Sequence, residues 1–222
     1  TKSWAGRKGK PRILKFAPKE YYHLYNRGTE KRQIFSSDAD RERFLALLYL
    51  SNGSVNVHIS NERGSTLIQL LALDRGEPLI DLCAYCLMPN HFHLLVRERN
   101  SDGISRFMQK LTTGYTMYFN TRRERTGALF QGKFKAEHAK EDRYLKYLIS
   151  YIHLNPVKLI ESKWKENGIS NRKRAETYLE QYCWSSFSDY CGMRRPEEIL
   201  INSSALPAYH ETPHDFKESV TE

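Results

Sequence analysis

The stretch MPNHFHLLV at residues 88–96 places two histidines around a phenylalanine, in a segment with the apolar density of a buried strand. Successive side chains of a strand point to opposite faces, so His91 and His93 share one face while Phe92 points into the other layer. Two imidazoles side by side on a rigid strand could form half of a metal site. They could also be ordinary core or edge residues, so the metal hypothesis needs a third ligand and a reacting group.

The segments around this stretch predict an antiparallel sheet. Residues 79–87 and 91–97 form a strand pair joined by a tight turn at 88–90, and the aromatic run 21–26 predicts another strand. A glycine turn and a further short strand are expected within 128–138. The segments 55–59 and 67–73 are also strand-like, with a turn between them.

Helices are expected where apolar residues recur at helical spacing after capping residues. Three are predicted in the first part of the chain, and Pro156 ends the third. The tail predicts a basic loop at 163–174, a helix near 176–183 and a small helix near 197–200. The order strand, helix, hairpin, helix, strand, helix favours an α+β fold, an antiparallel sheet with helices on one face. The three earlier helices follow Ser37, Ser101 and Glu141.

The composition indicates a globular protein with a polyanionic partner. The chain has 222 residues, of which 40% are hydrophobic and 27% charged, and its formal net charge is +9. A surplus of positive charge of this size favours nucleic acid as the partner. No apolar run approaches the roughly 20 residues that span a bilayer, and the N-terminus lacks a signal-peptide core, so no membrane contact and an intracellular location are expected.

The four cysteines do not resemble a disulfide framework in a chain of this length. Cys83 and Cys86 have C-x-x-C spacing, but on a strand this odd spacing points the two sulfurs to opposite faces. No second pair follows them, so a zinc site is not expected there.

Basic residues cluster in the first fifteen positions, which carry six lysines and arginines and no acid, and again around residues 122–135. Such an arm could lie along phosphates, and the aromatic and basic residues at 128–138 suit single-stranded nucleic acid. Each cation taken alone could instead be a solvated surface charge. The candidate phosphate contacts are Lys10, Arg12, Arg122, Arg123, Arg125, Lys133 and Lys135.

The helix expected at 141–155 supplies a candidate reacting group and a third ligand. Tyr151 and Asn155 are four residues apart, so they lie on one helix face, one turn from each other. The Asn155 amide oxygen could join the two histidines on a metal while Tyr151 presents its hydroxyl to the same phosphate. Tyr115 is the rival nucleophile, but the residue one turn further on is Phe119, which cannot bind a metal.

Four stretches, in order, carry a family resemblance: PNHFH at 89–93, QGKF at 131–134, YIHLNPVK at 151–158 and WSSF at 184–187. Together they resemble the single-tyrosine HUH transposases, and within them the REP-associated tyrosine transposase branch. The likeness covers roughly residues 21–190. The segment 52–77 is longer than the compact pattern needs, and the part after Tyr190 has no counterpart.

The resemblance implies a ferredoxin-like core, with the histidine pair on a central strand and the catalytic tyrosine on a helix packed across it. By this resemblance, His91 and His93 are the HUH histidines, Tyr151 is the nucleophile and Asn155 is the polar third metal ligand. Members use Mg²⁺ or Mn²⁺ to cut single-stranded DNA beside palindromic hairpins, and they form a 5′-phosphotyrosine link. The implied division is a basic arm at 1–19, a transposase core at 20–160 and an extension at 161–222.

The leading hypothesis is therefore a metal-dependent single-strand DNA endonuclease and strand transferase, acting at REP-like hairpins in the bacterial cytoplasm close to the nucleoid. A non-catalytic hairpin-binding regulator that keeps the fold is the alternative. A replication or conjugation initiator of the wider HUH class is a third possibility, although it often needs a helicase-like partner domain. A monomer and a homodimer both remain open.

Overall fold

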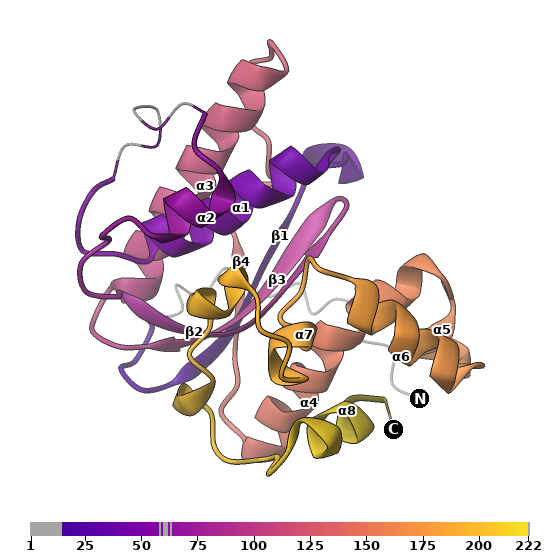
Figure 1. Cartoon of the computed structure of the whole chain (residues 1–222). Coiled ribbons are helices and arrows are strands. Elements are labelled where there is room, and N and C mark those ends of the chain that lie inside the picture. The colour runs from indigo at the N-terminus through magenta and orange to yellow at the C-terminus, as the bar shows by residue number, and fades with distance from the viewer. Residues whose placement is uncertain (1–14, 58, 60–61, 63, 222) are drawn as a thin grey trace.

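Four antiparallel strands form one sheet in the order β2-β3-β1-β4 (Figure 1). The computed structural model describes residues 15–57, 59, 62 and 64–221. The predicted hairpin is confirmed: β2 and β3 pair directly, and Met88 lies opposite His91 across the turn. β3 is an inner strand, so its side chains are held between two neighbours. The strands are β1 (Tyr21–Arg27), β2 (Ile80–Met88), β3 (His91–Glu98) and β4 (Lys135–His138).

Helices cover both faces of the sheet, which corrects the prediction of helices on one face (Figure 1). α1 (Asp38–Ser51) and α3 (Gly103–Arg122) share one apolar core with the sheet, and α4 (Asp142–Leu154) shares the other. All nine residues of β2 are buried, as expected for a strand covered on both sides. In the chain, α1, the β2–β3 hairpin and α3 follow β1 and precede β4, and this is the ferredoxin-like α+β fold that the family resemblance implied.

Phe92 and the histidines separate as the strand alternation predicts. The Phe92 ring is fully buried in the core under α1, where its centroid lies 5.0 Å from that of Phe44 and 5.9 Å from that of Phe130. His91 and His93 therefore face the α4 side of the sheet.

The prediction of strands at 55–59 and 67–73 is wrong where the structure describes these residues. Leu67–Leu71 form the short helix α2, and residues 55–57 belong to no strand. Thr66 and Gln69 make a capping box, in which each side chain accepts a hydrogen bond from the other residue's backbone N–H. This local helix start outweighs the strand-like apolar run. Residues 58, 60, 61 and 63 lie outside the described residues.

A β-bulge changes the orientation predicted for the cysteine pair. The pairing of β2 with β3 shifts between Leu82 and Ala84, so one extra residue is inserted at Cys83. Cys83 and Cys86 consequently lie in the same core, the one under α4, and not on opposite faces.

Most of the C-terminal segment packs on the α4 side and along the free edge of β2, while residues 196–200 contact α1 and α2 (Figure 1). Leu87 donates its backbone N–H to the Trp184 carbonyl at 2.9 Å, and the Ser186 hydroxyl accepts from Tyr85 N–H at 3.0 Å. The segment 163–174, expected to be a loop, contains the short helix Trp164–Asn167 and the start of the helix Arg172–Gln181. The Asn171 side chain caps the second helix by accepting from the Arg174 backbone N–H. The remaining α-helices are α5 (Trp164–Asn167), α6 (Arg172–Gln181), α7 (Phe187–Tyr190) and α8 (Pro213–Thr221).

Short 3₁₀ helices connect several of these elements, and the expected small helix near 197–200 is one of them. Within the described part of the chain, no helix combines the length and apolar character required to cross a bilayer. The 3₁₀ helices are η1 (Thr29–Lys31), η3 (Asn155–Leu159), η4 (Pro196–Leu200) and η5 (Ser203–Ala205).

Candidate active site

The two histidines of β3 lie side by side, with ring centroids 5.0 Å apart. His91 Nδ1 donates to the Asn90 side-chain oxygen at 2.6 Å, and His93 Nδ1 lies 2.8 Å from His23 Nε2. Both Nδ1 atoms are thus engaged, and neither Nε2 has a hydrogen-bond partner among residues that the structure describes. Such second partners are typical of metal-binding histidines, because they fix the ring and leave the other nitrogen available.

Tyr151 lies across from this pair on α4. Its ring centroid is 5.7 Å from that of His93 and 6.0 Å from that of His23. Leu148 and Ile152 are buried in the core between α4 and the sheet, and Tyr151 packs against this core on the same sheet-facing side of the helix. In the described part of the chain, the Tyr151 hydroxyl makes no hydrogen bond with another protein group.

Asn155 begins η3, one turn after Tyr151, and is buried. Its side-chain nitrogen donates to the Tyr151 carbonyl at 2.8 Å, which leaves the side-chain oxygen as an acceptor. Pro156 follows in η3, so the regular α-helix ends where Asn155 is placed. The end of α4 thus places Tyr151 and Asn155 one turn apart, as their spacing predicted.

The rival nucleophile Tyr115 is in the core on the other side of the sheet. Its side chain is fully buried under α1, and its hydroxyl donates to the Ile34 carbonyl. This hydroxyl is already used inside the protein and is separated from the histidine pair by the sheet. Tyr115 therefore has a structural role in this arrangement.

Burial controls the protonation of the site. It lowers the pKa of His91 to about 4, helped by the positive charges of Lys158, Lys165 and Arg27. Burial also lowers the pKa of His93 well below its ordinary value, with His23, His91 and Lys165 adding to the effect. Both imidazoles are therefore neutral near pH 7, which is the form that binds a metal.

The nucleophile candidate is protonated in the same environment. Burial raises the pKa of the Tyr151 hydroxyl, the Glu137 carboxylate raises it further, and Lys158 opposes them. Glu137 is held in place because it accepts hydrogen bonds from Tyr25 at 2.8 Å and Tyr144 at 3.0 Å. Attack by Tyr151 thus requires loss of its proton as the reaction proceeds.

His23 is a site residue that the sequence did not reveal. It lies on β1, is buried, and stacks on His93 with centroids 5.1 Å apart. Burial lowers the pKa of His23 to about 4, and its Nδ1 is buried with no partner among the described residues. The sequence showed only that His23 alternates with Tyr21 and Tyr25 on the expected strand. That His23 lies beside His93 follows from the pairing of β1 with β3, which the sequence does not reveal.

The donor set fits a divalent metal. His91 and His93 offer neutral imidazole nitrogens and Asn155 offers an amide oxygen, a mixed nitrogen and oxygen set that could hold a divalent cation with water completing the coordination. Within the described ranges, no group of three or more His, Cys, Asp or Glu side chains could hold a metal ion. A third protein ligand from outside those residue types, such as Asn155, is consistent with that finding.

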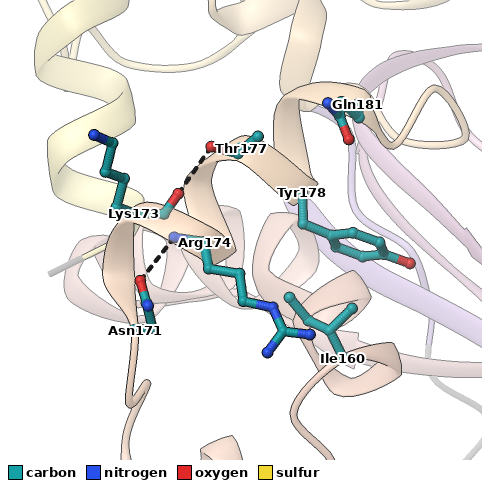
Figure 2. A pocket seen from close by; sticks show the side chains of 7 residues that line it. All are labelled: Ile160, Asn171, Lys173, Arg174, Thr177, Tyr178 and Gln181. Atoms are coloured by element: carbon teal, nitrogen blue, oxygen red, sulfur yellow. Dashed lines mark hydrogen bonds between the residues drawn. The ribbon is translucent and has the colours of Figure 1, made fainter.

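A pocket on α6 is separate from this site. Figure 2 shows that Lys173, Arg174 and Tyr178 of α6 line it together with Ile160. None of the histidines of β3 and neither Tyr151 nor Asn155 borders it.

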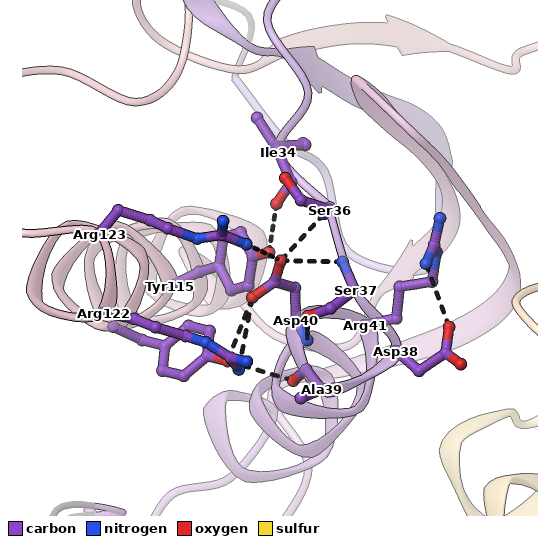
Figure 3. A network of polar contacts seen from close by, with 11 residues as sticks. Ile34, Ser36, Ser37, Asp38, Ala39, Asp40, Arg41, Tyr115, Arg122 and Arg123 are labelled. Carbon is purple, nitrogen blue, oxygen red and sulfur yellow. Dashed lines mark hydrogen bonds and ion pairs between the residues drawn. The ribbon is translucent and has the colours of Figure 1, made fainter.

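Three of the predicted phosphate-binding arginines are engaged within the protein. Arg123 pairs with the buried Asp40 carboxylate at 3.0 Å, and Arg122 lies 3.7 Å from the same carboxylate (Figure 3). Arg125 donates to the Asn120 side chain at 2.6 Å and to the Ala128 carbonyl at 3.2 Å. The contacts of Arg122 and Arg123 hold the end of α3 against the start of α1, whereas those of Arg125 stay within the end of α3 and the loop after it.

The other predicted cations are placed differently. Lys133 and Lys135 are exposed before and at the start of β4, and the Lys135 ammonium lies 6.0 Å from the centroid of the Tyr25 ring. In the described ranges, no carboxylate lies within 4.0 Å of either ammonium. Lys10 and Arg12 lie outside the described residues.

The fold and the site define a class: a histidine pair on an inner strand of an antiparallel sheet, faced by a tyrosine on a covering helix. The family described as "Transposase IS200 like" matches residues 17–155, which is more than half of the chain. The chain belongs to this family, as the motif resemblance implied. The match contains all four strands, the histidine pair, Tyr151 and Asn155.

Two relatives show how far the similarity extends. A curated protein of Haemophilus influenzae named as a REP-associated tyrosine transposase is 27% identical over 113 residues, which cover 45% of this chain and 64% of that protein. A solved structure of a REP-associated tyrosine transposase bound to a REP hairpin has a TM-score of 0.51 at 12% identity. That likeness of fold covers 85% of this chain and 90% of the solved chain.

Proposed function

We propose that this protein is a metal-dependent single-strand DNA endonuclease and strand transferase that acts beside hairpins and uses Tyr151 as its nucleophile. The observation that carries the proposal is the uncommitted Tyr151 hydroxyl on α4, which faces the oriented pair His91 and His93. Tyr115 lacks both properties, since its hydroxyl is bound to Ile34 in the opposite core.

Cleavage by Tyr151 is a transesterification. Its phenolic oxygen attacks the phosphorus in line, the bond to the 3′ oxygen breaks, and the DNA 5′ end becomes linked to Tyr151. The phenol proton is lost to solvent, and the leaving 3′ oxygen takes up a proton. A second 3′-hydroxyl can reverse the step and join two strands, because the phosphotyrosine keeps the energy of the phosphodiester.

His91, His93 and Asn155 would hold the metal, which withdraws negative charge from the phosphate when bound. The protein keeps both imidazoles neutral by burial and fixes their Nδ1 atoms with Asn90 and His23. The turn that links Asn155 to Tyr151 fixes the third ligand relative to the nucleophile. Preorganisation of this kind avoids reordering during the reaction.

Hairpin DNA is the proposed partner for two reasons. The formal net charge of +9 attracts a polyanion, and a solved structure with the same fold is that of a transposase bound to a REP hairpin. A protein with this activity would work in the bacterial cytoplasm, in contact with the nucleoid.

Tyr151→Phe tests the proposal. The full chain is incubated with Mn²⁺ and an end-labelled hairpin that carries single-stranded flanks, and denaturing electrophoresis detects a protein-linked fragment. We expect the wild type to form the adduct and Tyr151→Phe to lose it, by at least about 10³-fold, while hairpin binding is retained. Tyr147→Phe, one turn earlier on α4 with its ring 57% exposed, is the matched control and should keep the adduct.

Two outcomes would contradict this assignment. Adduct formation by Tyr151→Phe would remove Tyr151 as the nucleophile. Tight hairpin binding by the wild type, without adduct across a series of flanking sequences and with either metal, would favour the non-catalytic regulator.

A further inference from the structure

A lysine from the C-terminal segment lies against the candidate nucleophile. The Lys165 ammonium of α5 is 4.1 Å from the centroid of the Tyr151 ring and 5.5 Å from that of Trp164. An ammonium at this distance from an aromatic face is attracted by the ring quadrupole. Lys165 lies beyond residues 17–155, which match the transposase family, so the family match does not assign it a role.

Lys165 keeps its charge available. Among the residues that the structure describes, no carboxylate lies within 4.0 Å of this ammonium and no hydrogen bond uses its N–H groups. Other cations are paired with buried carboxylates, as Arg123 is with Asp40 and Arg97 with Asp81. An unpaired cation beside a proposed phosphate site can make a strong charge-assisted hydrogen bond to a phosphodiester oxygen.

The charge of Lys165 acts on the whole site. It contributes to lowering the pKa of His23, His91 and His93, after burial as the main cause. Burial also lowers the pKa of Lys165 itself.

We propose that Lys165 binds the scissile phosphate beside Tyr151, so that the C-terminal segment completes the active site. This inference rests on the proposed function. The face of the Tyr151 ring holds the ammonium without neutralising it, and the N–H groups are then free to donate to a non-bridging oxygen of the phosphate that Tyr151 attacks. Because negative charge on these oxygens is redistributed during attack, a fixed cation stabilises the transition state.

The competing explanation is that Lys165 only packs α5 onto Tyr151 and Trp164. Lys165→Met separates the two, because methionine keeps an unbranched apolar stem but has no charge. Lys165→Arg keeps the charge. Lys163→Met is the matched control, since Lys163 precedes α5 and, in the described part of the chain, its ammonium lies over no aromatic ring.

The first measurement is the single-turnover rate of adduct formation with hairpin DNA and Mn²⁺. We expect Lys165→Met to slow it by about 10- to 100-fold, Lys165→Arg to recover much of the loss, and Lys163→Met to match the wild type. A wild-type rate in Lys165→Met, with the wild type active, would overturn the inference and leave the proposed function intact.

The second measurement does not depend on cleavage. In the Tyr151→Phe background, binding is measured for oligonucleotides in which one linkage at a time is a neutral methylphosphonate. Neutralising the scissile linkage should weaken binding several-fold when Lys165 is present and have little effect in Lys165→Met. Equal losses at every linkage in both proteins would overturn the inference, even if the wild type forms no adduct and the proposed function fails.

Discussion

At the scale of single residues, the contact between His23 and His93 controls which nitrogen can bind a metal. For His93 Nε2 to have a free lone pair, His93 Nδ1 must carry the proton and donate it to His23 Nε2, 2.8 Å away. His23 then carries its own proton on Nδ1, the atom that is buried without a described partner. In this pair of tautomers the hydrogen bond leaves His93 Nε2 free to accept a metal ion.

His23→Phe should therefore weaken metal binding. The ring is roughly kept, but the acceptor for His93 Nδ1 is lost, and removal of such second partners typically costs about 10- to 100-fold in metal affinity. Isothermal titration with Mn²⁺ measures the change directly. His23→Gln, which can restore an acceptor, should recover part of it, and unchanged Mn²⁺ affinity in His23→Phe would show that the contact only packs the strands.

At the scale of elements, the junction of α1 and α3 depends on one buried carboxylate. Asp40 accepts from the backbone N–H groups of Ser36 and Ser37 at 2.9 and 3.1 Å, and from Arg123 (Figure 3). Burial alone would raise the pKa of Asp40, but the Ser36 N–H and the Arg123 guanidinium outweigh it, so the pKa is lowered. Arg123, which was predicted to bind phosphate, is therefore used to stabilise the ionised form of this side chain.

The lowered pKa fixes the sign of a pH effect on stability. Asp40 stabilises the folded state fully above its unfolded pKa of about 3.9, and this contribution is lost as pH falls through the lower folded pKa. Asp40→Asn lacks the contribution, so the difference in Tm from the wild type should be large at pH 7 and shrink below about pH 4. Thermal unfolding followed by circular dichroism between pH 7 and pH 2.5 measures it.

Asp38→Asn is the control for this comparison. Asp38 is also at the start of α1, but its side chain is 78% exposed. Its Tm difference should be small throughout. A wild-type advantage over Asp40→Asn that is independent of pH would show that the carboxylate charge does not stabilise the junction.

At the scale of the whole molecule, the positive charge should make DNA binding strongly dependent on salt. The formal net charge is +9, and Lys133, Lys135, Lys158 and Lys165 have no carboxylate within 4.0 Å in the described part of the chain. Each phosphate contact adds roughly 0.7 to 0.9 to the slope of log affinity against log salt. Four contacts predict a slope of about −3, measured by fluorescence anisotropy between 50 and 200 mM NaCl. A flat response would exclude phosphate contacts as the main source of affinity.

The sequence by itself determined the local relations that depend on strand and helix periodicity. The shared face of His91 and His93, the opposite direction of Phe92 and the single turn between Tyr151 and Asn155 all follow from repeats of 2 and 3.6 residues. The motif order identified the family, and the family match over residues 17–155 agrees with it.

Tertiary structure alone decided which distant residues meet. The pairing of β1 with β3 brought His23 to His93, and the packing of the C-terminal segment brought Lys165 to Tyr151. A bulge reversed the orientation of Cys83, and an internal carboxylate engaged Arg123. These contacts depend on strand register and helix packing, which combine segments far apart in the chain and leave no periodic trace in either segment. The histidine pair was thus predictable from residues 88–96, whereas the groups that tune it were not.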